Sequence, residues 1–357
     1  MKELEFKKEP AFVDREREMG ELKNYLETRP EAILFLYGSK SSGKTTLLYR
    51  LCAEMEKESR YEIKFLNLRE IFLENYDDFL KVFFKAGEEV SGLTVGTRRK
   101  YSLVGLFHLD AFTEKVLKKK EEDPFLVMKK ELSSLVKKGK QPVIIIDEFH
   151  KLREVYMANG QRRLIDELMN FFVAMTKENH LCQVIIASSD AFFIEEVYVD
   201  STLRKTSEFL KLDYFDREQV NEWLNNLERY SAIRDYTLSQ DEIEIIWDTV
   251  GGSPWEIQSI LGQLFQKSLT EVVARLRRER VATIVDIIRR DRERREPLLR
   301  MFREKPAVRA SELMDAPAEV LGQLVHDNIL YYDPVDGLYG LQGRSMELGV
   351  REYFEQV

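Results

Sequence analysis

The sequence predicts an α/β protein: a parallel, doubly wound sheet of five strands, followed by a helical domain and a C-terminal winged helix. Three observations lead to this fold class. Up to residue 215, short apolar runs of strand length alternate with segments of helical periodicity. Beyond residue 215 the helical pattern continues without strands, and the last 50 residues end in a strand–turn–strand pattern.

Five apolar segments carry the strand prediction. They are residues 32–38, 61–68, 142–147, 182–187 and 208–214. The third is rich in β-branched residues, which suits burial on both faces of a parallel sheet. Helices are expected from Lys44 to about Lys57 and over 165–177, and residues 70–140 are mostly helical in pattern with a break at 91–100. Strands that alternate with helices predict a parallel sheet covered on both faces.

The chain after residue 215 is expected to form a separate helical domain over 216–285. Helices are predicted over 216–228, 239–250 and 254–269. Asp216 and Ser239 are suitable N-caps, and Gly251-Gly252 ends the second helix. Residues 1–215 would then be the core domain.

The remaining residues, 286–357, are expected to form a winged helix. Pro297 interrupts the charged segment 269–305, so one continuous helix is not expected there. A short helix over 311–314 and a second over 317–328 precede two strands, 329–333 and 338–341. The turn between these strands is Pro334-Val335-Asp336-Gly337, which is typical of a hairpin.

Composition excludes several classes of protein. The 357 residues carry a net charge of −8, which disfavours a general polyanion binder. No apolar run approaches the roughly 18 residues that a membrane helix needs, and the charged N-terminus lacks the apolar stretch of a signal peptide. The two cysteines, Cys52 and Cys182, lie in apolar context and are expected to be buried, reduced thiols of a cytoplasmic protein.

The first strand is followed by a glycine-rich loop that opens a helix. Residues 38–45 match G-x-x-x-x-G-K-[ST], whose backbone N–H groups and helix N-terminus bind phosphate. The lysine neutralises the β- and γ-phosphates and the threonine hydroxyl ligates Mg²⁺. The sequence therefore predicts a P-loop NTPase core that binds ATP and Mg²⁺. The candidate nucleotide ligands here are Gly38, Ser39, Lys40, Ser41, Ser42, Gly43, Lys44, Thr45 and Thr46.

Two carboxylates follow the third strand. Asp147 is expected to hold Mg²⁺ with Thr45, and Glu148 to act as the general base that polarises the attacking water. The alternative for Glu148 is a surface carboxylate at a helix start. With His150 the acids also spell the D-E-x-H of certain helicases. Those enzymes need a second nucleotide-binding core, and only one is visible in this chain.

The fourth strand ends in Ser188-Ser189-Asp190. A polar side chain at this position, with Ser189 as the candidate, could position the attacking water near the γ-phosphate. The alternative is an N-cap for the next helix, which Ser189 or Asp190 would satisfy. One cluster can serve both purposes, so both interpretations stay open.

Together these motifs resemble the archaeal ATPase family of P-loop proteins, which is placed with the STAND class and near the AAA+ origin-recognition ATPases. Phe12-Val13-Asp14-Arg15-Glu16 with Glu18 is similar to the F-x-G-R-E-x-E box of this family, although Asp14 replaces the usual glycine. Gly251-Gly252-Ser253-Pro254 is similar to the G-G-x-P motif of the helical lid. The resemblance covers the whole chain, because a C-terminal winged helix is also expected. It implies that Phe12, Val13, Arg15 and Pro254 lie near the nucleotide.

The resemblance also implies an arginine that senses the γ-phosphate, in cis or from a neighbouring subunit of a nucleotide-dependent oligomer. Arg204, shortly before the fifth strand, is the candidate. Its planar guanidinium suits spread negative charge. The alternative is an ordinary surface arginine.

The purpose of the ATPase is less clear from the sequence. Residues 301–357 hold 5 basic and 10 acidic side chains, and the candidate recognition helix, 317–328, has no Lys or Arg. DNA phosphates would repel such a helix, so a protein partner is favoured, and the protein is expected to be a nucleotide-controlled switch. The alternative is a nucleic-acid-associated ATPase, of the origin-recognition or transposition type, that uses the arginine-rich segment 275–300 on DNA or RNA. That segment also fits an ion-paired, solvated helix face.

Overall fold

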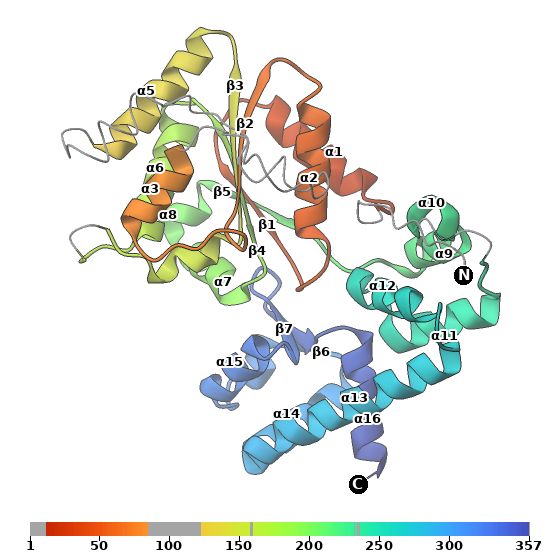
Figure 1. Cartoon of the computed structure of the whole chain (residues 1–357). Coiled ribbons are helices and arrows are strands. Elements are labelled where there is room, and N and C mark those ends of the chain that lie inside the picture. Colours follow the sequence, from red (N-terminus) through yellow and green to blue (C-terminus); the bar gives the residue numbers. More distant parts are fainter. Residues whose placement is uncertain (1–11, 85–122, 158–159, 232, 234–235, 357) are drawn as a thin grey trace. The chain divides into compact units, whose positions relative to one another are not determined.

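A computed structural model of the chain describes residues 12–84, 123–157, 160–231, 233 and 236–356 (Figure 1). Its contacts divide the chain into two compact units. The first contains the described residues up to Tyr37 together with Lys44–Lys211. The second contains Gly38–Gly43 and Leu212–Val357. The phosphate loop therefore shares a unit with the C-terminal part of the chain.

The first unit contains a five-stranded sheet, as predicted. Its strands are β1 (Ile33–Tyr37), β2 (Tyr61–Asn67), β3 (Gln141–Asp147), β4 (Gln183–Ser188) and β5 (Ser207–Lys211). They are ordered β2-β3-β4-β1-β5, and every neighbouring pair is parallel. The carboxyl ends of β1, β3 and β4 therefore lie at one edge, where Tyr37 pairs with Ser188 and Asp147 with Ala187.

Helices cover both faces of the sheet, which confirms the doubly wound arrangement. They are α1 (Glu16–Glu27), α2 (Lys44–Met55), α3 (Tyr76–Phe84), α5 (Pro124–Lys137), α6 (Leu164–Val173), α7 (Ala191–Val199) and α8 (Ser201–Arg204), with η2 (Phe149–Glu154) and η3 (Ala174–Glu178). Helices α1 and α2 lie on one face and α5 and α6 on the other (Figure 1). The helix predicted over 165–177 is α6 followed by the π-helical turn η3. The predicted break at 91–100 lies outside the described residues.

The second unit begins with four helices. They are α9 (Arg217–Asn225), α10 (Leu227–Ser231), α11 (Gln240–Val250) and α12 (Pro254–Gln263). Asp216 and Ser239 form capping boxes at α9 and α11, as the sequence predicts. The prediction that one helix extends from Pro254 to Leu269 is wrong. Helix α12 ends at Gln263, because Ser268 accepts a hydrogen bond from the Glu271 amide and caps a new helix.

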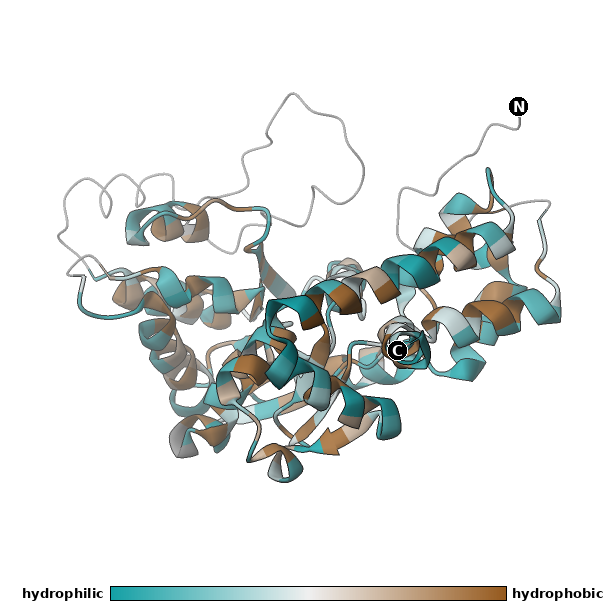
Figure 2. Cartoon of the chain, turned by 90° about the horizontal axis from the view of Figure 1, so that it is seen from below, coloured by the Kyte–Doolittle hydropathy of each residue, from teal (hydrophilic) through white to brown (hydrophobic). Residues whose placement is uncertain are grey.

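That new helix is α13 (Leu269–Arg290), and α14 (Arg292–Glu304) follows it. The chain is interrupted here, as expected, but at Asp291 and not at Pro297, which lies inside α14. Asp291 adopts φ −160° and its carboxylate caps α14 by accepting from the Arg294 amide. Both helices carry hydrophilic and hydrophobic residues on different sides (Figure 2).

The chain ends in a small antiparallel sheet with helices packed on it. Its elements are β6 (Ala307–Arg309), η4 (Ala310–Leu313), α15 (Ala318–His326), β7 (Leu330–Asp333), β8 (Leu338–Leu341) and α16 (Arg344–Gln356), with strand order β6-β8-β7. The two predicted strands and the two predicted short helices are present. Strand β6 and helix α16 were not predicted. One apolar core joins these elements to α13 and α14 through side chains such as Ile287, Leu299 and Val350.

Within the described residues, no helix combines the length and the apolar character that crossing a membrane requires. The predicted division into domains 1–215, 216–285 and 286–357 remains a prediction.

Candidate functional site

The phosphate loop follows β1 and leads into α2, as its sequence predicts. Gly38 has φ 143°, and a Cβ added there would lie 2.2 Å from the Leu212 carbonyl oxygen, so only glycine fits. Gly43 has φ 99°, and Ser41 also adopts a positive φ of 63°. The loop therefore turns sharply enough to direct successive backbone N–H groups toward a bound anion.

Lys44 begins α2 and its side chain is buried, with 5% exposure. Burial lowers the pKa of Lys44 to about 8, although the charges of Asp147 and Glu148 act in the opposite direction. A buried ammonium group is poorly solvated, and a phosphate anion would stabilise its charged form. Thr46, on the same first turn, is half-buried.

Thr45 and Asp147 meet at this edge of the sheet. The Thr45 hydroxyl donates to Asp147 Oδ2 at 2.5 Å. Burial, with a smaller contribution from the charge of Glu148, raises the pKa of Asp147. The two oxygens suit Mg²⁺, which accepts a few protein oxygens and takes its other ligands from water and phosphate. No cluster of three or more acidic, histidine or cysteine ligands occurs in the part of the chain that the structure describes.

Glu148 lies between β3 and the short helix η2 in a left-handed conformation, with φ 60°. Its carboxylate is 3% exposed yet has partners on both sides. Arg69 Nη2 lies 2.7 Å from Oε1, and His150 Nε2 lies 3.4 Å from Oε2. A left-handed residue that is neither glycine nor asparagine indicates strain held by its surroundings, which is common at functional sites.

The polar end of β4 contributes Ser188 to this cluster. Ser188 Oγ lies 2.9 Å from His150 Nδ1 and accepts from the Asp190 amide at 3.0 Å. Asp190 caps α7 by accepting from the Phe193 amide, which confirms one of the two alternatives for this segment. Ser189 makes no side-chain hydrogen bond to the described residues. Ser188 is therefore the serine that contacts His150, which lies beside Glu148.

Arg204 lies at the end of α8 and is exposed. Its guanidinium stacks 4.4 Å from the centre of the Tyr198 ring and donates to the Tyr198 hydroxyl at 3.1 Å. Within the described residues it contacts neither Asp147 nor Glu148. An exposed arginine of this kind is available to a neighbouring molecule.

The N-terminal box is ordered around α1. Val13 and Arg15 are buried, and Arg15 pairs with Glu18 at 2.9 Å. The Arg50 guanidinium lies 5.6 Å from the centre of the Phe12 ring. Asp14 has φ 25°, which explains why the resembling family has glycine there, since glycine adopts positive φ without steric cost.

The G-G-x-P motif forms a close backbone contact within the second unit. Gly252 O accepts from the Phe215 amide at 3.0 Å, and a Cβ on Gly252 would lie 1.7 Å from Phe215 O. Gly251 ends α11 with φ 57°, and Pro254 is the first residue of α12. The motif therefore holds the start of α12 against the chain that leaves the sheet.

Tyr214, just before this contact, was not predicted from the sequence. Its hydroxyl donates to the Lys40 carbonyl of the phosphate loop at 2.9 Å and accepts from Gln342 Nε2 at 3.0 Å. Burial raises the pKa of Tyr214 to about 12. The residue therefore joins three segments that are far apart in sequence.

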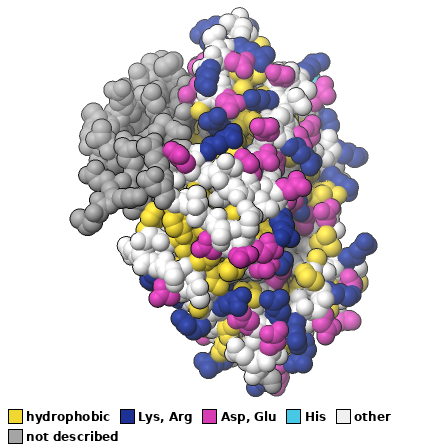
Figure 3. Space-filling model, turned by 90° about the vertical axis from the view of Figure 1, so that its right-hand side faces the viewer, with side chains coloured by type: hydrophobic (Ala, Val, Ile, Leu, Met, Phe, Trp, Pro, Cys, Tyr) yellow, Lys and Arg dark blue, Asp and Glu magenta, His cyan; other side chains and the backbone are white. Residues whose placement is uncertain are grey.

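The arginine-rich segment is largely ion-paired. Arg280 pairs with Glu256, Arg290 with Asp286 and Asp327, and Arg292 with Glu296. Arg278 and Arg289 have no acidic partner among the residues with described positions. On the face drawn in Figure 3, basic and acidic side chains are interspersed.

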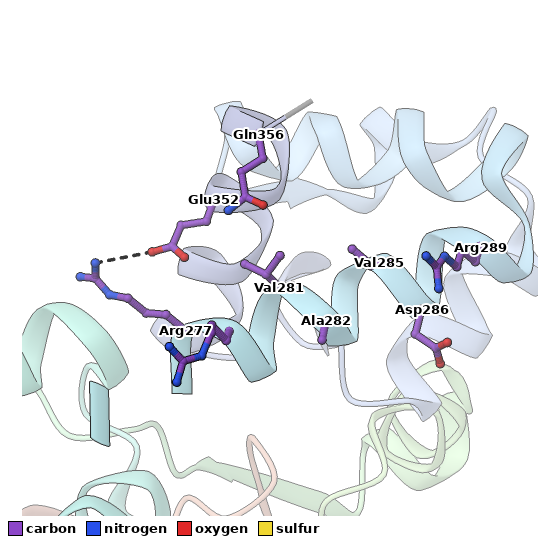
Figure 4. A pocket seen from close by; sticks show the side chains of 9 residues that line it. Arg277, Val281, Ala282, Val285, Asp286, Arg289, Glu352 and Gln356 are labelled. Carbon is purple, nitrogen blue, oxygen red and sulfur yellow. Dashed lines mark ion pairs between the residues drawn. The ribbon is translucent and has the colours of Figure 1, made fainter. Parts of the chain in front are cut away.

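A groove of about 420 Å³ runs along α13 beside α16. Figure 4 shows its apolar residues Val281, Ala282 and Val285, with charged side chains at both ends. At one end, Arg277 pairs with Glu352 at 3.6 Å. The groove carries both signs of charge, so it does not favour a polyanion.

The residues of the candidate site that sequence reasoning missed are Arg69, Ser188 and Tyr214. The sequence placed Ser188 beside the candidate Ser189, and strand alternation could have distinguished the two. Arg69 follows β2, which pairs with β3, so the strand order was needed to find it. Tyr214 carries no motif, and no local signal identifies it.

Comparisons with known proteins agree with this geometry. A family model described as an ATPase domain predominantly from Archaea matches residues 12–260. Two uncharacterized ATP-binding proteins of Methanocaldococcus jannaschii are 33% and 32% identical over 338 and 345 residues. The alignments cover 91% and 90% of this chain, and 91% and 94% of the two relatives.

Solved structures share the fold. The Walker-type ATPase of Pyrococcus abyssi has a TM-score of 0.64 at 17% identity, and the match covers 95% of this chain and 96% of that one. The ORC2 protein of Aeropyrum pernix in its ADP form has a TM-score of 0.54 at 13% identity, with 97% and 95% covered. The P-loop ATPase core and the family predicted from the motifs are therefore confirmed.

Proposed function

Because the chain belongs to the family of ATPase domains found predominantly in Archaea, we propose that it is a magnesium-dependent ATPase whose bound nucleotide controls its C-terminal residues. The protein would then be a conformational switch. The observation that carries this proposal is the hydroxyl of Tyr214, which joins the phosphate loop to the segment before α16.

The phosphate loop and α2 supply the nucleotide site in this proposal. The loop amides and Lys44 bind the phosphates, whose negative charge would stabilise the buried ammonium group. Thr45 and Asp147 hold Mg²⁺, which neutralises phosphate charge when bound. The relation of Phe12, Val13, Arg15 and Pro254 to the adenine end is carried over from the family resemblance.

Glu148 acts as the general base. Glu148 follows β3 directly and is adjacent to Asp147, the proposed magnesium ligand. From this position its carboxylate could polarise the attacking water. Arg69 holds one of its oxygens at 2.7 Å, and the other faces His150. Arg204, which contacts no acid of this site within the described residues, is proposed to reach the γ-phosphate from a neighbouring subunit.

Tyr214 transmits the nucleotide state. When the phosphate loop closes on phosphate, the Lys40 carbonyl shifts, and the hydroxyl that donates to it must follow or lose the bond. The same hydroxyl accepts from Gln342, between β8 and α16. A bond worth about 1 kcal/mol on each side is enough to bias two conformations that differ by a few kcal/mol.

The partner of the switched part is proposed to be a protein. Helix α15, the candidate recognition helix of a winged helix, contains no Lys or Arg. Most arginines of the segment 275–300 have acidic partners, so few remain to neutralise phosphates. Nucleic-acid binding with a steep salt dependence would instead support the alternative of a nucleic-acid ATPase.

Tyr214→Phe tests the proposal because it removes the hydroxyl and keeps the ring. Wild-type protein should show an ATP-dependent change in amide hydrogen exchange over residues 338–343 and the first turn of α16. The variant should bind ATP with an affinity within about threefold of wild type and lose most of that change, since a neutral hydrogen bond contributes about 1 kcal/mol.

Gln342→Ala breaks the same link from the other side and should give the same result, whereas the exposed Tyr236→Phe is the matched control. If both Tyr214→Phe and Gln342→Ala keep the full ATP-dependent change in exchange, the proposed connection is wrong.

A further inference from the structure

His150 lies where it can fix the orientation of Glu148. His150 belongs to η2 and its side chain is half-buried, and its two nitrogens face different partners. Nδ1 lies 2.9 Å from Ser188 Oγ, and Nε2 lies 3.4 Å from Glu148 Oε2. The imidazole therefore bridges the end of β4 and the proposed base at the end of β3.

The partners of the two nitrogens favour one tautomer of His150. Ser188 Oγ accepts from the Asp190 amide at 3.0 Å and has a proton that it can donate to Nδ1. Nε2 then carries the imidazole proton and points it toward the Glu148 carboxylate. The opposite tautomer would place a lone pair against a carboxylate oxygen, which is unfavourable.

The surroundings favour the neutral ring. Burial is the largest effect and lowers the pKa of His150; nearby Arg153, Arg69 and Lys151 act in the same direction, and Asp190 opposes them. A neutral imidazole with a fixed tautomer is a directional donor.

We propose that His150 is a positioning residue for the ATPase reaction: its Nε2 faces Glu148 and limits the orientation of that carboxylate, and its contact with Ser188 orients the ring. This inference rests on the proposed role of Glu148 as general base. The left-handed backbone of Glu148 gives the side chain an uncommon direction, and its two oxygens lie 2.7 Å from Arg69 Nη2 and 3.4 Å from His150 Nε2. Ser188 also pairs with Tyr37, the last residue of β1 before the phosphate loop. A shift of β1 on phosphate binding would thus reach Glu148 through Ser188 and His150.

Two substitutions separate the nitrogens. The amide nitrogen of Gln occupies the place of Nε2, and that of Asn the place of Nδ1. His150→Gln should keep the contact with Glu148 and retain kcat within about threefold, whereas His150→Asn should lower kcat about tenfold or more, a part of the 10²–10⁴ that a general base supplies. KM for ATP should stay within about twofold in both variants, because neither touches the phosphates.

Ser188→Ala should lower kcat as His150→Asn does, and the double variant should be no worse than the poorer single one, because both remove the same arrangement. The exposed His326→Asn is the matched control and should behave as wild type. Melting temperatures distinguish a positioning role of His150 from a role in stability. The His150→Gln and His150→Asn variants should unfold at the same temperature and differ only in kcat.

The inference is overturned if the His150→Asn variant keeps wild-type kcat, or if the His150→Gln and His150→Asn variants lose kcat equally. The Glu148→Gln variant separates failure of the proposed base from failure of the role of His150. If Glu148→Gln hydrolyses ATP normally, the proposed base is wrong; if it is inactive while His150→Asn is fully active, only the role of His150 is wrong.

Discussion

Lys44 should destabilise the folded protein in the absence of nucleotide, although ATP binding is expected to require it. Its ammonium is buried with 5% exposure at the start of α2. Substituting Lys44→Met keeps the unbranched apolar chain and removes the charge. We expect the variant to lose ATP binding and to unfold at a higher denaturant concentration than wild type.

The magnitude follows from the pKa of Lys44, which burial lowers from 10.5 to about 8. Each pKa unit corresponds to 1.36 kcal/mol, so the charged form costs the fold about 3 kcal/mol at neutral pH. The lowered pKa already includes the attraction between Lys44 and the carboxylates of Asp147 and Glu148. Repacking around the methionine reduces the gain, so an increase of about 1–3 kcal/mol is expected.

The pH dependence has a definite sign. Between pH 8 and 10.5 the unfolded chain holds the Lys44 proton and the folded chain releases it, so stability rises with pH in this window. Below about pH 8 the cost is complete, and above 10.5 it vanishes. The stability difference between Lys44→Met and wild type should therefore be largest at pH 7 and shrink toward zero near pH 10.5.

Urea unfolding without nucleotide or Mg²⁺, measured at pH 7, 9 and 10.5, gives this difference directly, and fluorescent ATP measures binding. A Lys44→Met variant that is less stable than wild type at pH 7, or a difference that does not change with pH, would refute the reasoning. Wild-type affinity for ATP in this variant would contradict the phosphate-site assignment itself.

Two further predictions concern hydrolysis. Glu148→Gln should bind ATP with near wild-type affinity and lose turnover by roughly 10²–10⁴, the contribution of a general base, which single-turnover assays with labelled ATP would measure; normal hydrolysis would exclude Glu148. Arg204→Ala should slow hydrolysis on the order of 10³ if it acts on the transition state of a neighbouring molecule, and adding an excess of a Lys44→Met partner that supplies an intact Arg204 should restore the rate; a change below threefold would return Arg204 to an ordinary surface role.

The nucleotide site was predictable because its signals are local. The loop from Gly38 to Thr45 and the pair Asp147-Glu148 each follow an apolar strand, and parallel strands bring such ends to the same edge of a sheet. The five strands were predictable for a related reason. Each is an apolar run long enough for a strand and bounded by polar residues.

The partners of Glu148 were not predictable in the same way. Arg69 and His150 contact it because β2 pairs with β3 and because η2 turns the chain back toward β4. Sequence spacing does not encode such contacts between elements. The choice between Ser188 and Ser189 depended on a single position in the register, which decides the direction in which a side chain points.

Helix ends depended on competition between caps. Pro297 was expected to break the charged segment, but α14 continues through it. The missing N–H of Pro297 costs one helical hydrogen bond, and burial of Leu298 and Leu299 in the C-terminal core offsets that cost. Asp291 ends α13 with its backbone N–H on the Ile288 carbonyl and caps α14 with its carboxylate, a double use that no residue-by-residue propensity anticipates.

The contact between Gly38 and Leu212 has a consequence for the evolution of the chain. No side chain fits at Gly38, because even a methyl group would collide with the Leu212 carbonyl. At this point the phosphate loop and the chain that leaves β5 meet backbone to backbone, so any side chain at Gly38 would push them apart. A substitution at Gly38 would therefore disturb both the phosphate loop and the exit from β5, which limits the changes that this position can accept.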